Sequence, residues 1–191
     1  MGPISVLDEC YTAKYNEVKD EDMEENNMLD DGNSMSVAVE LKPMTPEMYH
    51  MFFQEYENDM DLYLDKNDFH EYVYEESKVD AYIQRQIDLN RKPFAIMYGD
   101  EIVGELKIYD IQIGKTAVLG ITMKNHKYKD RGFGTSAERL AVDYVFHQLD
   151  IPVLYADCIL TNTRIQHVLE KVGFQFLYAD EQRKHYQIRR N

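Results

Sequence analysis

The stretch that decides the fold is residues 116–145, TAVLGITMKNHKYKDRGFGTSAERLAVDYV. Its first eight residues are mostly apolar and predict a central strand, and its last nine carry apolar side chains at helical spacing. Between them, Gly132 and Gly134 let the backbone come close to a ligand. The N–H groups at the start of a helix attract anions, and residues 124–131 carry a net charge of +3. This arrangement predicts a phosphate-bearing ligand.

Two nucleotide-binding motifs and a plain turn are the alternatives for this loop. The dinucleotide-binding pattern requires a third glycine and a parallel βαβ unit, and no third glycine follows Gly134 in this stretch. The phosphate loop of nucleoside triphosphatases requires Gly-Lys-Ser or Gly-Lys-Thr, which the stretch lacks. On spacing alone, the loop is also compatible with a turn that binds nothing.

The flanking segments predict an α+β protein with a mostly antiparallel sheet flanked by helices. Thr45-Pro46 is typical of a helix start, Ser77-x-x-Asp80 resembles a capping box, and Gly173 is typical of a helix end. The predicted strands are residues 37–41, 94–98, 102–109, 116–123, 153–160, 174–178 and 185–188, and the predicted helical faces lie in 48–56, 79–87, 137–145 and 165–172.

Charge separates the front of the chain from the rest. The whole chain carries −14, of which residues 1–34 contribute −8. We expect an acidic, flexible segment at 1–35 and one domain at 36–191. The acidic front half would repel phosphates, which disfavours nucleic acid as a partner and favours cationic small molecules or basic peptides.

Several classes of protein are excluded by what the sequence lacks. No apolar run approaches the ~20 residues of a membrane helix, and the first residues do not resemble a secretory signal. Cys10 and Cys158 cannot form a disulfide framework or a zinc site by themselves, and the six histidines have no metal-like spacing. We therefore expect no metal, no membrane partner and a reducing, cytoplasmic compartment.

Two motifs resemble the GNAT superfamily of N-acetyltransferases. Residues 120–137 are similar to its acyl-CoA motif, Gln/Arg-x-x-Gly-x-Gly/Ala, with Lys129 in the Gln/Arg position. Residues 162–174 are similar to a second segment of that superfamily, Asn-Thr-Arg followed by Tyr-Glu-Lys-x-Gly-Phe. The resemblance covers roughly residues 36–190 and is closest to the branch of ribosomal-protein and polyamine acetyltransferases.

The resemblance implies two central strands that splay apart, with acetyl-CoA as co-substrate in the gap. The pyrophosphate would sit on the N–H groups of the glycine loop, the pantetheine arm would pair with the end of the central strand like an added strand, and Asn162 would hold the arm from the other side. The residues assigned to acetyl-CoA in this way are Ile121, Thr122, Met123, Lys129, Asp130, Arg131, Gly132, Phe133, Gly134, Thr135 and Asn162.

The implied reaction is direct transfer of an acetyl group to a primary amine, which needs a base because amines are mostly protonated at neutral pH. Relatives often carry a glutamate where this chain has Val118, and a general-acid tyrosine where it has Leu169. Glu105, Asp157 and His126 are candidate bases by position, and release of the proton to water is an alternative.

The acceptor implied by resemblance and charge is a cationic small molecule or a basic protein N-terminus. Relatives place it near the segment equivalent to residues 57–75, which is acidic and aromatic here. A homodimer is possible because dimers are common in relatives. Because two familiar catalytic residue types are missing, a non-catalytic acyl-CoA-binding module is the alternative function.

Overall fold

The computed structural model describes residues 37–190, so the acidic segment predicted at 1–35 lies outside it. No helix within 37–190 is both long and apolar enough to cross a membrane. The strands are β1 (Glu40–Pro43), β2 (Lys92–Tyr98), β3 (Glu101–Gln112), β4 (Thr116–Met123), β5 (Val153–Ile159), β6 (Gln175–Ala179) and β7 (Arg183–Arg189), and the helices are α2 (Pro46–Gln54), α3 (Glu76–Asp88), α4 (Phe133–Asp143) and α5 (Thr163–Val172).

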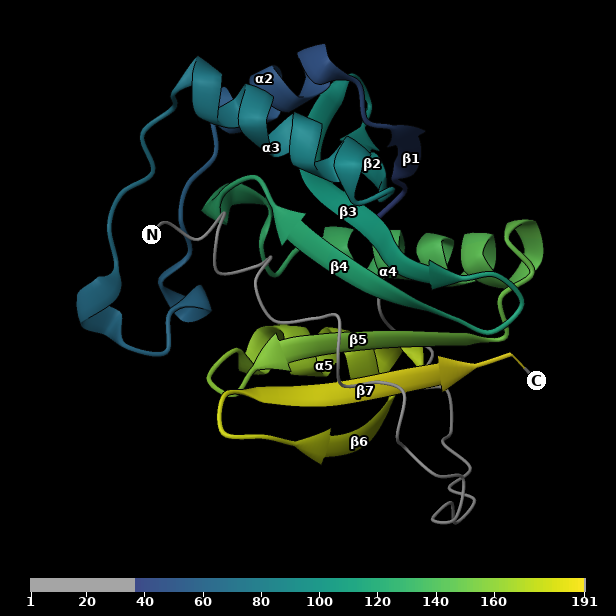
Figure 1. Ribbon diagram of the computed structural model, residues 1–191. Helices are drawn as coiled ribbons and strands as arrows, with labels where there is room; N and C mark the ends of the chain where they lie inside the picture. The colour runs from purple at the N-terminus through teal and green to yellow at the C-terminus, as the bar shows by residue number, and fades with distance from the viewer. Residues whose placement is uncertain (1–36, 191) are drawn as a thin grey trace.

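One sheet of seven strands has the order β1-β2-β3-β4-β5-β7-β6. Neighbouring strands are antiparallel except β4 and β5, which run parallel. The parallel pairing joins only Thr116–Leu119 to Val153–Ala156. Beyond it the two strands diverge, as Figure 1 shows. The predicted α+β class, the mostly antiparallel sheet and the splay are therefore confirmed.

Helices cover the two faces of this sheet unequally. Helices α2 and α3 lie over β2 and β3, whereas α4 and α5 lie behind β4 and β5 on the opposite face (Figure 1). Because side chains alternate along a strand, β3 contributes side chains to both faces of the sheet. Leu106 and Ile108 join the core under α4, together with Phe133 and Leu169. On the other face, aromatic residues of α2 and α3 pack in a second core on Ala95 of β2.

The helix ends follow from short sequence signals. Thr45 caps α2 by accepting a hydrogen bond from the Met48 N–H at 3.3 Å, and Pro46 opens the helix as predicted. Gly173 ends α5 with a φ of 108°, a left-handed conformation that favours glycine. The strand predicted from residue 37 begins its pairing only at Glu40.

Three local predictions were wrong. The capping box does not form, because α3 begins at Glu76 and leaves Ser77 inside the helix. Ile87 is 64% exposed, and the neighbouring Gln86 is buried instead. In α4, Leu140 is 41% exposed although it was predicted to face the core, and Glu138 is fully buried instead. Ala137, Ala141 and Val145 are buried as predicted, so the buried face of α4 is only shifted towards Glu138 and away from Leu140.

The segment between α2 and α3 has no long regular element. It contains two 3-10 turns, Met60–Leu62 and Lys66–Asp68. Each turn is started by an aspartate, Asp59 or Asp65, whose side chain accepts a hydrogen bond from the N–H two residues later. These local bonds fix the shape of the two turns.

Candidate active site

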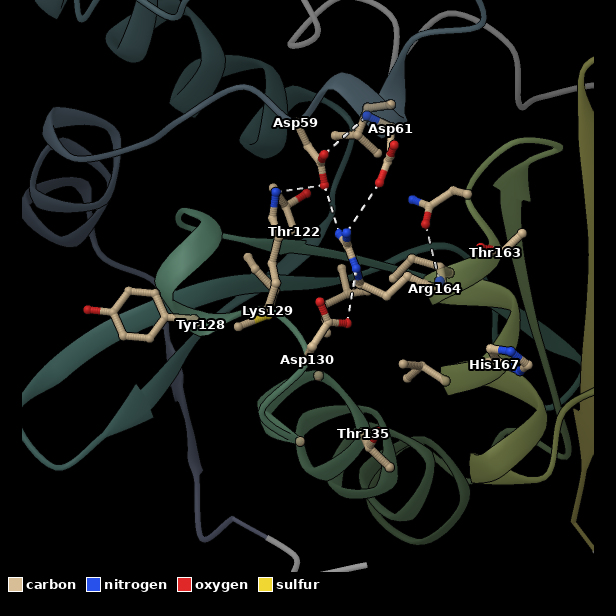
Figure 2. Close-up of a pocket in the computed structure, with 18 of the residues that line it drawn as sticks. Asp59, Asp61, Thr122, Tyr128, Lys129, Asp130, Thr135, Thr163, Arg164 and His167 are labelled. Atoms are coloured by element: carbon tan, nitrogen blue, oxygen red, sulfur yellow. Dashed lines mark hydrogen bonds and ion pairs between the residues drawn. The ribbon is translucent and has the colours of Figure 1, made fainter.

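A cavity of about 550 Å³ lies where β4 and β5 separate. Its walls are the end of β4, the loop from β4 to the first turn of α4, one side of α5, and residues of the loop that follows α2. Figure 2 shows the side chains of these segments around one space. The splay therefore brings together both motifs that the sequence singled out.

The N-terminus of α4 forms one wall of this cavity. Gly132 precedes the helix with a φ of 86°, and the N–H groups of the first turn have no acceptor within the helix. Gly132, Gly134 and Thr135 all line the cavity. A Cβ placed on Gly134 would meet only Ile121 Cδ1, at 3.8 Å, outside its own helix. The backbone here is open to a ligand, and its geometry suits an anion.

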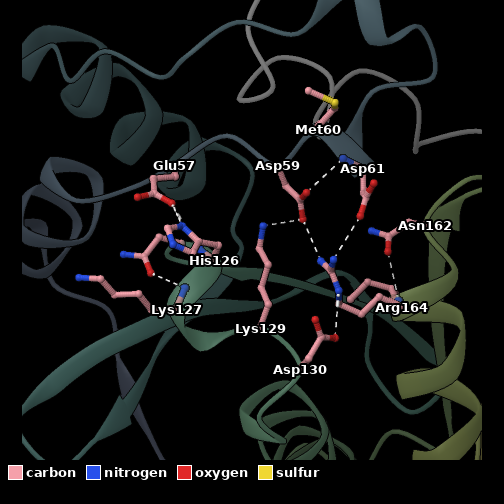
Figure 3. A network of polar contacts seen from close by, with 12 residues as sticks. Glu57, Asp59, Met60, Asp61, His126, Lys127, Lys129, Asp130, Asn162 and Arg164 are labelled. Carbon is pink, nitrogen blue, oxygen red and sulfur yellow. Dashed lines mark hydrogen bonds and ion pairs between the residues drawn. The ribbon is translucent and has the colours of Figure 1, made fainter.

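A network of ion pairs crosses the mouth of the cavity (Figure 3). Lys129 Nζ lies 2.7 Å from Asp59 Oδ2, and Arg164 Nη1 lies 3.1 Å from the same oxygen. Arg164 also contacts Asp61 at 3.2 Å and Asp130 at 3.1 Å. Burial raises the pKa of Asp59, but hydrogen bonding by Lys129 and the surrounding positive charges outweigh it, so its pKa lies below the ordinary value. The network ties the α2–α3 loop to the start of α5.

Most of the residues that the resemblance assigned to acetyl-CoA meet at this cavity. Arg131 and Phe133 do not line it: Phe133 is buried in the core, and Arg131 stacks over its ring at 5.6 Å. Asn162 lines the cavity, and its Oδ1 also accepts a hydrogen bond from the Ile165 N–H that caps α5. The predicted residues that line it are Ile121, Thr122, Met123, Lys129, Asp130, Gly132, Gly134, Thr135 and Asn162.

A smaller chamber of about 90 Å³ adjoins this cavity and shares Ile121, Thr122 and Asn162 with it. It lies between the diverging strands, and α4 and α5 contribute Glu138 and Leu169 to its wall. The strands supply, among others, Gly120 of β4 and Asp157, Cys158 and Ile159 of β5. The chamber is thus the inner end of the cleft, just beyond the last parallel pair.

Glu138 is the residue that the sequence-based interpretation missed. Its side chain is fully buried, and neither carboxyl oxygen has a hydrogen-bond partner among residues 37–190. Burial raises its pKa to about 8. The available signal was an acidic residue directly beside Ala137, on the apolar side of a short helix.

Of the three candidate bases, only Asp157 lines the cleft. Its carboxylate lies 2.5 Å from Arg183 Nη1, and its side chain is 4% exposed. His126 is on an exposed turn, where its Nδ1 lies 2.5 Å from Glu57 Oε2. The imidazole therefore faces solvent rather than the chamber.

Glu105 lies on the face of β3 that α2 and α3 cover. It is 3% exposed and accepts hydrogen bonds from the hydroxyls of Tyr49 at 3.0 Å and Tyr82 at 2.8 Å. Lys107 Nζ donates to the same Tyr82 hydroxyl at 3.2 Å. Glu105 is therefore held in a buried polar cluster and lines neither cavity.

The aromatic residues of the 57–75 segment pack inward. Tyr63 is 6% exposed, and Tyr72 lies between Phe53 and Tyr56 with ring centroids 5.8 and 5.1 Å away. Within residues 37–190, no group of His, Cys, Asp and Glu could hold a metal ion. The cleft thus offers backbone N–H groups, an open strand edge and lining carboxylates that include the candidate base Asp157.

Known proteins resemble this chain in sequence and in fold. The probable N-acetyltransferase YjcK of Bacillus subtilis (strain 168) is 34% identical over 77 residues, which are 39% of this chain and 42% of that protein. Spermidine N-acetyltransferase from Vibrio cholerae, solved with CoA and spermine, has a TM-score of 0.63 at 17% identity and covers 79% of this chain and 95% of its own. Aminoglycoside acetyltransferase AAC(6')-Ib, solved with coenzyme A, has a TM-score of 0.65 at 15% identity, with 80% and 95% covered. The sequence profile described as "Acetyltransferase (GNAT) domain" matches residues 38–175. This match spans most of the chain, and the protein therefore belongs to the GNAT acetyltransferase family.

Proposed function

We propose that the protein transfers an acetyl group from acetyl-CoA directly to a primary amine of a cationic small molecule or a basic protein N-terminus. The observation that carries the proposal is the cleft between β4 and β5, which leads from the N-terminus of α4 to a smaller chamber. A long ligand with phosphates at one end and a small acyl group at the other fits that shape.

The residues present suit acetyl-CoA. The open backbone at Gly134 and the N–H groups of the first turn of α4 would hold the pyrophosphate. Past Leu119, β4 has no pairing with β5, so the backbone of Ile121–Met123 is available to the pantetheine amides on that side. Asn162 would contact the arm from α5. Acetyl-CoA supplies the activated thioester, and the protein supplies orientation.

Asp157 is the candidate base that the geometry favours. Its carboxylate lines the chamber, whereas Glu105 and His126 do not. We propose that Asp157 attracts the ammonium form of the acceptor and takes up its proton, directly or through water, so that the neutral amine can attack. Arg183 orients this carboxylate through their ion pair.

The acceptor class rests on charge and on the relatives. A net charge of −14 favours cationic acceptors electrostatically, and two of the similar structures are named as spermidine and aminoglycoside acetyltransferases. We therefore propose a polyamine-like or aminoglycoside-like amine, or a basic N-terminus. A cytoplasmic location remains a prediction from the sequence, and a homodimer remains a prediction of the resemblance.

A non-catalytic acyl-CoA-binding module is the second candidate. It is favoured by Val118 and Leu169, which are 3% and 1% exposed and offer no acid or base at positions where relatives often carry one. The two candidates share the cleft and differ only in turnover.

The test measures thiol release from acetyl-CoA with spermidine, an aminoglycoside and a peptide with a free N-terminus, beside a no-acceptor control. Amine-dependent release supports the transferase, and tight CoA binding in calorimetry without release from a wide panel supports the binding module. Gly134→Ala is the matched variant, because its methyl group has room within the protein but would occupy the space proposed for phosphate. We expect it to weaken CoA binding about tenfold or more through loss of one charge-assisted hydrogen bond. Absence of CoA binding by the wild-type protein would contradict both candidates.

A further inference from the structure

Glu138 is the most unusual group in the cleft. A carboxyl group buried without a hydrogen-bond partner is costly to the fold, so its presence calls for a specific reason. Both of its oxygens lack a partner among the described residues, and the side chain lines the chamber at the inner end of the cleft. A group placed this way has hydrogen-bonding capacity that is available to a ligand in the chamber.

A residue of α5 that lines the same chamber indicates which catalytic group of relatives the carboxyl group of Glu138 could replace. Leu169 of α5 lines the same chamber and stands where relatives often carry a tyrosine that acts as general acid. At this chamber, α5 therefore presents no acidic side chain, whereas α4 presents Glu138. Cys158 is the other weak proton donor there, but burial raises the pKa of its thiol to about 12, which makes it a poor acid.

We propose that Glu138, as a neutral carboxylic acid, hydrogen-bonds the sulfur of coenzyme A and gives it a proton when the thiolate leaves. This inference rests on the proposed function. As the new bond forms between the amine nitrogen and the acetyl carbon, the carbon–sulfur bond breaks and its electron pair stays on sulfur. The proton of Glu138 passes to that sulfur, and the resulting carboxylate regains a proton from water or from the proton released by the amine.

The surroundings of Glu138 favour the protonated form. Burial alone raises its pKa to about 8, so the carboxyl group keeps its proton at neutral pH. Helix α5 and strand β4 present no titratable side chain to the chamber. The titratable groups that do line it are Lys107, Tyr109, Asp157, Cys158 and Arg183, of which Asp157 and Arg183 pair with each other.

The first test measures binding, so it does not depend on turnover. Calorimetry compares coenzyme A with desulfo-coenzyme A, which lacks the sulfur, on the wild-type protein, Glu138→Gln and Glu138→Leu. We expect the wild-type protein to prefer coenzyme A by about tenfold, the worth of one hydrogen bond. Glu138→Leu should lose this preference, and Glu138→Gln, which still has a donor, should keep part of it. Equal preference in the wild-type protein and Glu138→Leu would overturn the proposal.

The second test measures rate against pH. Because the acid must hold its proton, kcat of the wild-type protein should fall as pH rises through about 8. In Glu138→Gln, kcat should be lower by ~100-fold or more, and the fall of kcat near pH 8 should be absent. The double variant Glu138→Leu with Leu169→Tyr restores an acid from the other helix and should recover part of kcat, which a purely structural role would not predict. An unchanged kcat and pH profile in Glu138→Gln would refute the role. If the wild-type protein binds coenzyme A but acetylates no amine, the proposed function fails, and the comparison with desulfo-coenzyme A still decides whether Glu138 contacts sulfur.

Discussion

The buried carboxyl group of Glu138 should make the stability of the protein fall as pH rises. In the unfolded chain a glutamate loses its proton near its ordinary pKa of 4.5, but in the folded protein burial raises the pKa to about 8. Between these values the folded state binds one proton more than the unfolded state. Raising the pH therefore favours unfolding, by about 1.4 kcal/mol per pH unit for this group.

The substitution Glu138→Gln removes this dependence while nearly preserving the volume of the side chain. Integrated from pH 5 to pH 8, the shift of the pKa from 4.5 to about 8 corresponds to about 3.5 kcal/mol. The difference in unfolding free energy between variant and wild type should grow by roughly that amount over this range. A buried amide without a partner changes the stability by a constant offset, so only the slope is diagnostic.

Urea unfolding at several pH values between 5 and 8 measures this difference directly. The exposed substitution Glu181→Gln is the control, and it should leave the slope of the wild-type protein unchanged. Parallel stability curves for wild type and Glu138→Gln would refute the reasoning, because they would mean that Glu138 ionises in the folded protein much as it does in the unfolded chain.

Three further predictions concern the support of the site. Tyr82→Phe removes the hydroxyl that lies 2.8 Å from Glu105 Oε2 and should lower the unfolding free energy in urea by about 1–3 kcal/mol. An unchanged unfolding free energy would contradict a stabilising role for this buried hydrogen bond. Asp59→Asn should lower the melting temperature at pH 7, and this gap should narrow as pH falls below the ordinary pKa of 3.8. The lowered pKa of Asp59 adds stability that is lost when the carboxylate takes up a proton, and a gap that does not change with pH would contradict this. Gly104→Ala would place a Cβ 2.9 Å from the Thr122 carbonyl oxygen and should destabilise by about 1–3 kcal/mol in urea; wild-type stability would contradict the close approach.

Local signals predicted the elements that surround the site. The apolar run of β4, the glycines before α4 and Gly173 after α5 each act over a few residues, and the structure confirms all of them. The ion pairs of the acidic loop were harder to predict, because the partners of Asp59 come from distant parts of the chain. Arg164 is 105 positions away, and no spacing rule connects the two.

Glu138 was missed for a different reason. Periodicity gives the apolar side of a helix, but a short helix held between a sheet and a second helix can rotate so that a neighbouring position faces inward. Here the sheet and α5 enclose Glu138, while Leu140 points towards solvent. A buried acid follows from tertiary packing, which helical spacing alone does not predict.

The short parallel seam between β4 and β5 also divides the molecule into two blocks. Strands β1–β4 and strands β5–β7 each form their own antiparallel set, and along the sheet only four residue pairs join them. The chain crosses from one block to the other through a turn at Asp150. A ligand in the cleft would contact both blocks and stabilise their association. Two fragments separated at that turn would then reassemble more readily when the ligand is present, which would make the severed protein a sensor of its own co-substrate.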